Sequence, residues 1–141
     1  MAAVTARTPQ EQVVIDFFRI LSTGEPEPIR AALHPDATWK PMVENIPGAG
    51  SYGPRDNIVD DFLVPVRGMF RPGDPKTTVD TIVSQGDFVM VESHGAGKLQ
   101  DGRDYFNRYA WAVEVKDGLI FAIREYMDSH YVAVLFGFDK A

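Results

Sequence analysis

The sequence contains no cysteine, and this absence excludes a disulfide scaffold, a thiolate nucleophile and a metal site with cysteine ligands. It also lacks any apolar run near the roughly 20 residues that are needed to span a membrane. The first residues, Met1 to Arg7, lack the apolar core of a secretory signal. We therefore expect a cytoplasmic protein that has no membrane partner.

Basic residues are also scarce. The chain carries 14 Lys and Arg against 20 Asp and Glu, which gives a formal net charge of −6. Because a nucleic-acid binder needs a basic face for the phosphates, we expect no nucleic-acid partner. The 141 residues, 45% of them hydrophobic, are enough for one core and predict a single domain over residues 1–141.

Helix signals dominate the first half of the chain. Thr8, followed three residues later by Glu11, forms a capping box that begins a helix, and Gly24 ends it. Apolar spacing then predicts a short helix, a strand with Trp39 and a long helix that Pro65 should kink or split. These elements are expected over Glu27 to Leu33, Ala37 to Val43, and Pro54 to Phe70.

The second half is rich in β-branched and aromatic residues, which predict strands. The expected strands are Thr77 to Ser84, Phe88 to Ala96, Tyr105 to Lys116 and Leu119 to Met127. Short turns between them predict an antiparallel meander, and a last helix is expected from Asp128 to about Phe136. The order indicates an α+β fold: a cone-shaped curved antiparallel sheet wrapped around three N-terminal helices, with a short C-terminal helix and an internal pocket.

Several stretches support a more specific interpretation. They are the segments Asn107 to Trp111, Asp117 to Ile120 and Arg124 to Asp128, the helix entry Gly50 to Arg55, and the Gly86-Asp87 turn. Together they resemble the SnoaL-like proteins of the nuclear-transport-factor-2-like superfamily, which includes ketosteroid isomerase, limonene epoxide hydrolase and polyketide cyclases. The resemblance implies a pocket closed by helices and floored by the sheet, in a homodimer. It also implies that Glu125 stands where the cyclases and the epoxide hydrolase carry a catalytic Asp.

One departure from the superfamily concerns the epoxide hydrolase. Its mechanism needs an Arg and an Asp two residues apart on the second long strand, whereas this chain has Glu92 to Ala96 there. An epoxide-hydrolase-like enzyme is therefore a weak alternative. We expect no cofactor. We also expect no metal, because Glu92 and His94 would need a third ligand that the sequence does not supply.

Glu125 is the first candidate catalytic residue. Side chains alternate along a strand, so Glu125 shares a face with the apolar Ile123 and Met127. Burial there would raise the pKa of its carboxyl toward neutrality, which suits proton transfer. The structural alternative is a salt bridge between Glu125 and Arg108 on the adjacent strand.

His94 is the second candidate, because Glu92 lies two residues away on the same strand face and could orient the imidazole for acid/base work. A structural histidine is about equally well supported. Asp128, at the junction between strand and helix, suits an N-cap. The alternative for Asp128 is a role at the substrate site beside Glu125.

The third candidate is Tyr109, which together with Asn107 could donate hydrogen bonds to a carbonyl or a developing enolate. The turn decides whether this face is the pocket: a two-residue turn places Glu125 opposite Ala110, and a three-residue turn places it opposite Tyr109. Other residues are expected to contact the substrate. They are Trp39, Tyr52, Glu92, Asn107, Met127 and Asp128.

These residues favour cofactor-free acid/base catalysis of the isomerase, cyclase or lyase type on a small hydrophobic carbonyl compound. The alternative is a module of the same fold that binds a small ligand or dimerises without catalysis. A homodimer through the outer face of the sheet is expected, because the long strands carry apolar residues on both faces.

Overall fold

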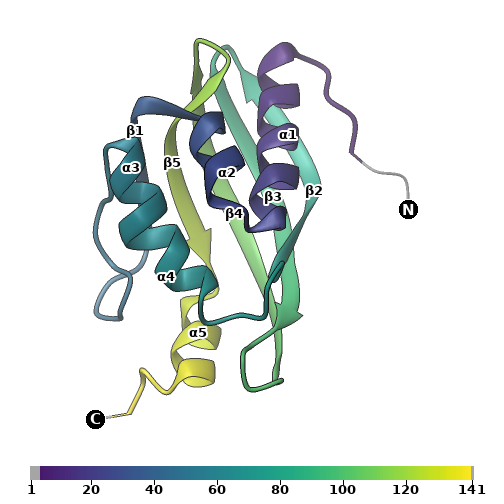
Figure 1. The fold of residues 1–141 in the computed structure, drawn as a ribbon. Coiled ribbons are helices and arrows are strands. Elements are labelled where there is room, and N and C mark those ends of the chain that lie inside the picture. The colour runs from purple at the N-terminus through teal and green to yellow at the C-terminus, as the bar shows by residue number, and fades with distance from the viewer. Residues whose placement is uncertain (1–3, 141) are drawn as a thin grey trace.

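A computed structural model describes residues 4–140 and contains a five-stranded sheet in the order β1-β5-β4-β3-β2 (Figure 1). The strands are β1 (Leu33–Pro41), β2 (Lys76–Gln85), β3 (Phe88–Lys98), β4 (Asp104–Lys116) and β5 (Leu119–Met127). Strands β2 to β5 pair as an antiparallel meander, and β1 joins the edge parallel to β5. The α+β fold with a curved sheet, predicted from the sequence, is confirmed.

The helices lie against one face of this sheet (Figure 1). They are α1 (Pro9–Thr23), α2 (Pro26–Ala32), α3 (Arg55–Asn57), the π-helical turn η1 (Ile58–Leu63), α4 (Val64–Arg67) and α5 (Ser129–Phe136). The capping signals act as expected at three ends. The Glu11 N–H donates to Thr8 Oγ1, Gly24 is left-handed, and the Tyr131 N–H donates to the N-cap Asp128.

The long helix expected from Pro54 to Phe70 is instead one helical segment, from Arg55 to Arg67, with a π turn in its middle. Proline has no N–H to donate, and its ring crowds the carbonyl four residues back. A π turn before Pro65 accommodates the proline within the helix. In this turn the Val64 N–H donates to the Val59 carbonyl, five residues earlier. Pro65 therefore falls in the first turn of α4, and the segment continues past it.

Strand β1 begins four residues earlier than predicted, because Leu33 already pairs with β5 before an irregular stretch interrupts the ladder. Leu33 pairs with Ile120 and Thr38 pairs with Ala122, so the residues between Leu33 and Thr38 bulge out of register. Pro35, which cannot donate to a ladder, lies within this irregular stretch. The local sequence pattern of such a stretch predicts a loop.

The main core lies between α1 and the concave face of the sheet. Phe17 and Phe18 of α1 contact Trp39 and Trp111, with ring centroids 6.1 Å and 4.9 Å apart respectively. A second, smaller cluster joins Phe70, Leu99 and Tyr105, and residues of α5 pack against it. These two clusters leave an open space between them above the concave face.

The β4–β5 hairpin sets which side chains face that space. Asp117 and Gly118 form a two-residue turn with φ of 54° and 72°, but Phe121 then bulges from β5 and shifts the register by one residue. Glu125 therefore lies opposite Trp111. Both registers expected from the sequence, with Ala110 or Tyr109 opposite Glu125, are wrong.

Candidate functional site

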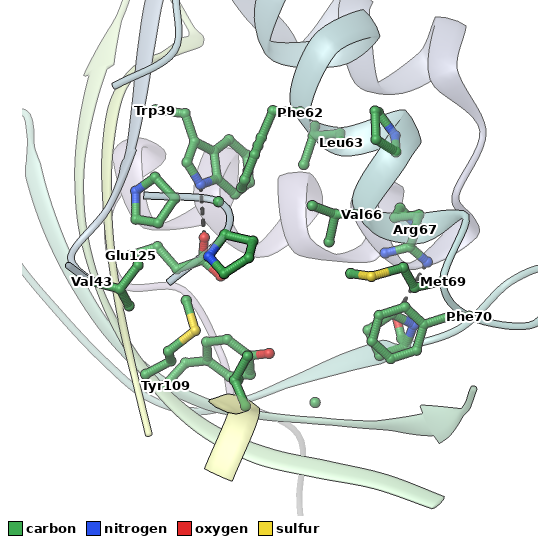
Figure 2. A pocket seen from close by; sticks show the side chains of 18 of the residues that line it. Trp39, Val43, Phe62, Leu63, Val66, Arg67, Met69, Phe70, Tyr109 and Glu125 are labelled. Carbon is green, nitrogen blue, oxygen red and sulfur yellow. Dashed lines mark hydrogen bonds between the residues drawn. The ribbon is translucent and has the colours of Figure 1, made fainter. Parts of the chain in front are cut away.

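A cavity of about 350 Å³ lies between the sheet, the η1–α4 segment and α5 (Figure 2). Its wall takes aromatic residues from both core clusters, among them Trp39, Trp111 and Tyr105. The lining is mostly apolar. Among the described residues, its charged side chains are Asp61, Arg67 and Glu125.

Glu125 lies at the floor of this cavity and is only 9% exposed. The indole Nε1 of Trp39 donates a 2.9 Å hydrogen bond to Glu125 Oε1, and Figure 2 shows the two side chains facing each other. The backbone of Glu125 is held between β4 and β1, and its carbonyl accepts the Met42 N–H at 2.7 Å. Within residues 4–140, no further hydrogen bond reaches the carboxyl, so Oε2 is left for a ligand.

Burial raises the pKa of Glu125 to about 7, and the hydrogen bond from Trp39 opposes only part of this rise. Removal from water disfavours the charged carboxylate, and no cation within salt-bridge distance offsets the effect among the described residues. The alternative salt bridge with Arg108 is wrong. The Arg108 guanidinium instead lies over the Phe106 ring, with 5.2 Å from its carbon to the ring centroid.

Tyr109 also lines the cavity, on the same concave face as Glu125. Its ring stacks on Trp111 with centroids 5.3 Å apart, and its hydroxyl bonds to the hydroxyl of Tyr105. The Asn107 amide in turn donates to the Tyr105 oxygen at 3.2 Å. Desolvation raises the pKa of Tyr109 well above its usual value, so its hydroxyl stays protonated and able to donate.

The Asn107 amide and the hydroxyls of Tyr105 and Tyr109 form one hydrogen-bonded group. The Tyr105 oxygen accepts from Asn107, and either tyrosine hydroxyl can donate to the other. When Tyr105 is the donor, the O–H of Tyr109 is available to a group in the cavity. Asn107, expected to contact the substrate, is buried and does not line the cavity. Its amide bonds instead to the Tyr105 hydroxyl.

Three of the other expected substrate contacts also line the cavity: Trp39, Tyr52 and Met127. The Tyr52 ring stacks on Phe62 with centroids 4.4 Å apart. Its hydroxyl donates to the Gly48 carbonyl at 3.1 Å, so its O–H is already used within the protein.

Asp128 does not line the cavity. Its Oδ1 accepts the Tyr131 N–H at 3.1 Å and caps α5, while its carbonyl accepts a 3.3 Å bond from the Asn107 amide. The expected substrate role of Asp128 is therefore corrected to the structural alternative, the N-cap.

The expected pairing of His94 with Glu92 is wrong. Both side chains lie on the outer face of β3, because the alternating Val91 and Ser93 are the buried ones. His94 Nδ1 lies 2.8 Å from Asp80 Oδ2, and Glu92 accepts a 2.8 Å bond from the Thr81 hydroxyl. Neither residue lines the cavity.

Sequence reasoning missed part of the wall. The η1–α4 segment contributes Phe62, Leu63, Val66 and Arg67, and α5 with the tail after it contributes Val132, Phe136 and Phe138. The helical spacing of Phe62 and Val66 indicated an inward face, but nothing in the local pattern told a core face from a cavity wall. Arg67 gave no signal at all.

Two kinds of feature are absent from residues 4–140. No cluster of three or more His, Asp or Glu side chains is arranged to hold a metal ion. In the same part of the chain, no helix is both long and apolar enough to cross a membrane.

The sequence profile of the SnoaL-like domain family matches residues 14–123. This match begins within α1, ends within β5 and does not include α5. The chain therefore belongs to the SnoaL-like family. Among curated protein sequences, none matches this chain significantly.

Solved structures with the same fold extend over nearly the whole chain. TerC, co-crystallised with polyporic acid, is 17% identical with a TM-score of 0.79, over 92% of this chain and 99% of its own. A nuclear-transport-factor-2-like protein from Burkholderia thailandensis is 24% identical with a TM-score of 0.76, over 93% and 98%. A candidate SnoaL-like polyketide cyclase from Jannaschia is 14% identical with a TM-score of 0.75, over 98% and 99%. At these identities the likeness establishes the fold.

The buried carboxyl makes stability depend on pH in a defined direction. The usual pKa of Glu is 4.5, and that of Glu125 in the folded protein is about 7. Below pH 4.5 the carboxyl is protonated in both the folded and the unfolded protein, so its burial costs no stability through ionisation. As pH rises through 7 the folded protein must also ionise this carboxyl. The free energy of unfolding is then lowered by the full amount, about 3 kcal/mol for a shift of this size.

We therefore expect Glu125→Gln to gain stability relative to the wild type as pH rises from 5 to 8, since glutamine still accepts the Trp39 N–H and never ionises. Urea unfolding at four pH values across this range measures the difference. Glu44→Gln, at an exposed position, is the control and should show no such trend. A stability difference that is constant with pH, or that shifts toward the wild type, contradicts the buried-acid assignment.

Proposed function

We propose that the protein is a cofactor-free acid/base catalyst that moves a proton on a small hydrophobic carbonyl compound bound in the cavity. The observation that carries this proposal is the Glu125 carboxyl: it is buried, has no cationic partner among the described residues, and lies against an apolar cavity. With a pKa of about 7, acid and base forms are both populated near neutral pH, which is the condition for efficient proton transfer.

The reaction step follows from the two polar groups of the wall. Glu125 in its ionised form takes a proton from the carbon next to the substrate carbonyl, and the electron pair moves onto the carbonyl oxygen. The Tyr109 O–H donates a hydrogen bond to that developing enolate oxygen, with Tyr105 and Asn107 holding its direction. Protonated Glu125 then returns the proton to carbon, at the same or a different position.

The family and the solved relatives support a small-molecule ligand. TerC was co-crystallised with polyporic acid, and other structural neighbours carry the words isomerase and polyketide cyclase in their names. Isomerisation, cyclisation and dehydration would all begin with the step described above. An epoxide-hydrolase-like reaction is not proposed, because the corresponding stretch, Glu92 to Ala96, contains neither an Arg nor an Asp.

A second candidate function is ligand binding without catalysis. One observation favours it: the described cavity wall contains no imidazole, and His94 lies on the outer face of the sheet. Glu125 would then act only as a hydrogen-bond partner for the ligand.

Deuterium exchange distinguishes the two functions without a known substrate. In D₂O at pH 7, we expect the wild type to accelerate exchange at the carbon next to the carbonyl of α-tetralone, followed by proton NMR. Glu125→Gln should lower the rate by roughly two to four orders of magnitude, and Tyr109→Phe by about ten- to a hundredfold, while Glu44→Gln leaves it unchanged.

Quenching of Trp39 and Trp111, both in the cavity wall, measures binding of the same ketone. Binding to the wild type without any exchange supports the binding module instead of the catalyst. Exchange that persists in Glu125→Gln at the wild-type rate contradicts the assigned role of Glu125.

We also propose that the protein forms a homodimer through the outer face of the sheet. Phe88 and Met90 on β3 alternate with buried residues and are 53% and 46% exposed, and Phe106 and Tyr126 add to the same face. Exposed apolar side chains gathered on one face are typical of an interface.

Light scattering should therefore give a dimer mass at micromolar concentration, and Met90→Glu should shift it toward the monomer. Val134→Glu, an exposed apolar position on α5, should leave the mass unchanged. A monomeric wild type contradicts this interface.

A further inference from the structure

Arg67 is a cavity residue to which the proposed reaction assigns no role. It ends α4 and lies on the cavity wall, and its guanidinium is partly buried. In Figure 2 this guanidinium is on the other side of the cavity from Glu125, with Leu63 and Val66 between them. Apart from the exposed Asp61, the cavity therefore has Glu125 at one side, Arg67 at the other and apolar side chains between them.

The protein itself leaves most of the Arg67 hydrogen-bonding capacity unused. Nη2 donates to the Pro75 carbonyl at 3.2 Å, and within residues 4–140 this is the only hydrogen bond that the guanidinium makes. A guanidinium carries five N–H donors. No carboxylate of the described residues lies within 4.0 Å of it.

The charges near Arg67 do not neutralise it. Asp74 favours the charged form from a distance, but burial outweighs it and lowers the Arg67 pKa. Asp61, the remaining acidic residue of the wall besides Glu125, is exposed and makes no ion pair with Arg67 within the described chain. A partly desolvated guanidinium without a counter-ion favours binding of an anion.

A purely structural role accounts for the stem of Arg67 but not for its charge. The side chain packs under the end of α1, where a Cβ at Gly24 would lie 3.1 Å from Arg67 Nε, and it ties α4 to the start of β2 through Pro75. One neutral donor would suffice for that bond. The remaining donors have no partner in the described protein.

We propose that Arg67 is an anion-binding residue of this cavity, and that the ligand is an elongated hydrophobic compound with a carboxylate or similar anionic group at the end away from Glu125. This inference rests on the proposed function for the reacting end of the ligand. The guanidinium fork holds the anionic group by two parallel hydrogen bonds, the apolar wall covers the body of the ligand, and the carbonyl reaches Glu125 and Tyr109.

Two fluorescent probes that differ in a single group test this inference. 1-Anilinonaphthalene-8-sulfonate is anionic, and N-phenyl-1-naphthylamine has the same ring system without the sulfonate. Titrations at pH 6, where Glu125 is mainly protonated, follow energy transfer from Trp39 and Trp111. In the wild type the anionic probe should bind more tightly, and the neutral probe should displace it.

The variants then isolate the charge. Arg67→Gln should weaken the anionic probe at least tenfold, as expected for a hydrogen-bonded ion pair, and change the neutral probe by less than twofold. Arg67→Lys should retain part of the preference for the anion. Arg19→Gln, which removes the same charge from an exposed position on α1, should change neither affinity. Circular dichroism melts establish that each variant is folded.

The possible failures are distinguishable. If Arg67→Gln loses affinity for both probes equally, or for neither, the anion-binding role of Arg67 is wrong. The ligand cavity and the proposed role of Glu125 are not contradicted by that result. Failure of both probes to bind the wild type contradicts the ligand cavity itself, and with it both the inference and the proposed function.

Discussion

The burial of one carboxyl group without a cation is the constraint on which the site depends. Glu125 has an indole N–H as its hydrogen-bond donor and apolar neighbours around it, so its ionisation is held near neutral pH by desolvation. An adjacent arginine would stabilise the charged form and remove this property. The fold instead places Arg108 on the opposite face of the sheet, and Arg67 at the far side of the cavity.

Two irregular backbone features create the space around that carboxyl. The bulge at Phe121 turns Glu125 toward Trp111 and puts Tyr109 and Met127 beside it on the concave face. The π turn before Pro65 lets one helical segment continue to Arg67, so that Phe62, Leu63 and Val66 form the opposite wall. Bulges and π turns are frequent next to functional sites because they re-aim side chains without ending the element.

The sequence predicted those parts of the structure that depend on local chemistry. Thr8, Gly24 and Asp128 mark helix ends through their own hydrogen bonds or backbone preference, and β5 was bounded correctly because turn residues flank it. The apolar neighbours of Glu125 correctly indicated its environment. The register did not follow from the sequence, because nothing in the local pattern marks Phe121 as the residue that bulges.

The misplacement of His94 has a similar cause. Strand β3 is apolar on both faces near its start, from Phe88 to Val91, so alternation alone cannot tell which set faces the core. Its partner Asp80 is the unpaired residue at a register irregularity in β2. Arg67 was missed because a cation at the end of a helix normally reads as a solvent-exposed residue, and only the arrangement of α1, α4 and β2 encloses it.

The central claim is that Glu125 is a buried acid whose pKa lies near neutrality. A pH titration of the side-chain carboxyl carbons by ¹³C NMR, with glutamate labelled, measures this directly, and the Glu125→Gln spectrum assigns the signal. One glutamate carboxyl should titrate with a midpoint near 7 and be missing from the variant. If every glutamate carboxyl titrates below about pH 5, within the ordinary range for this side chain, the claim is wrong.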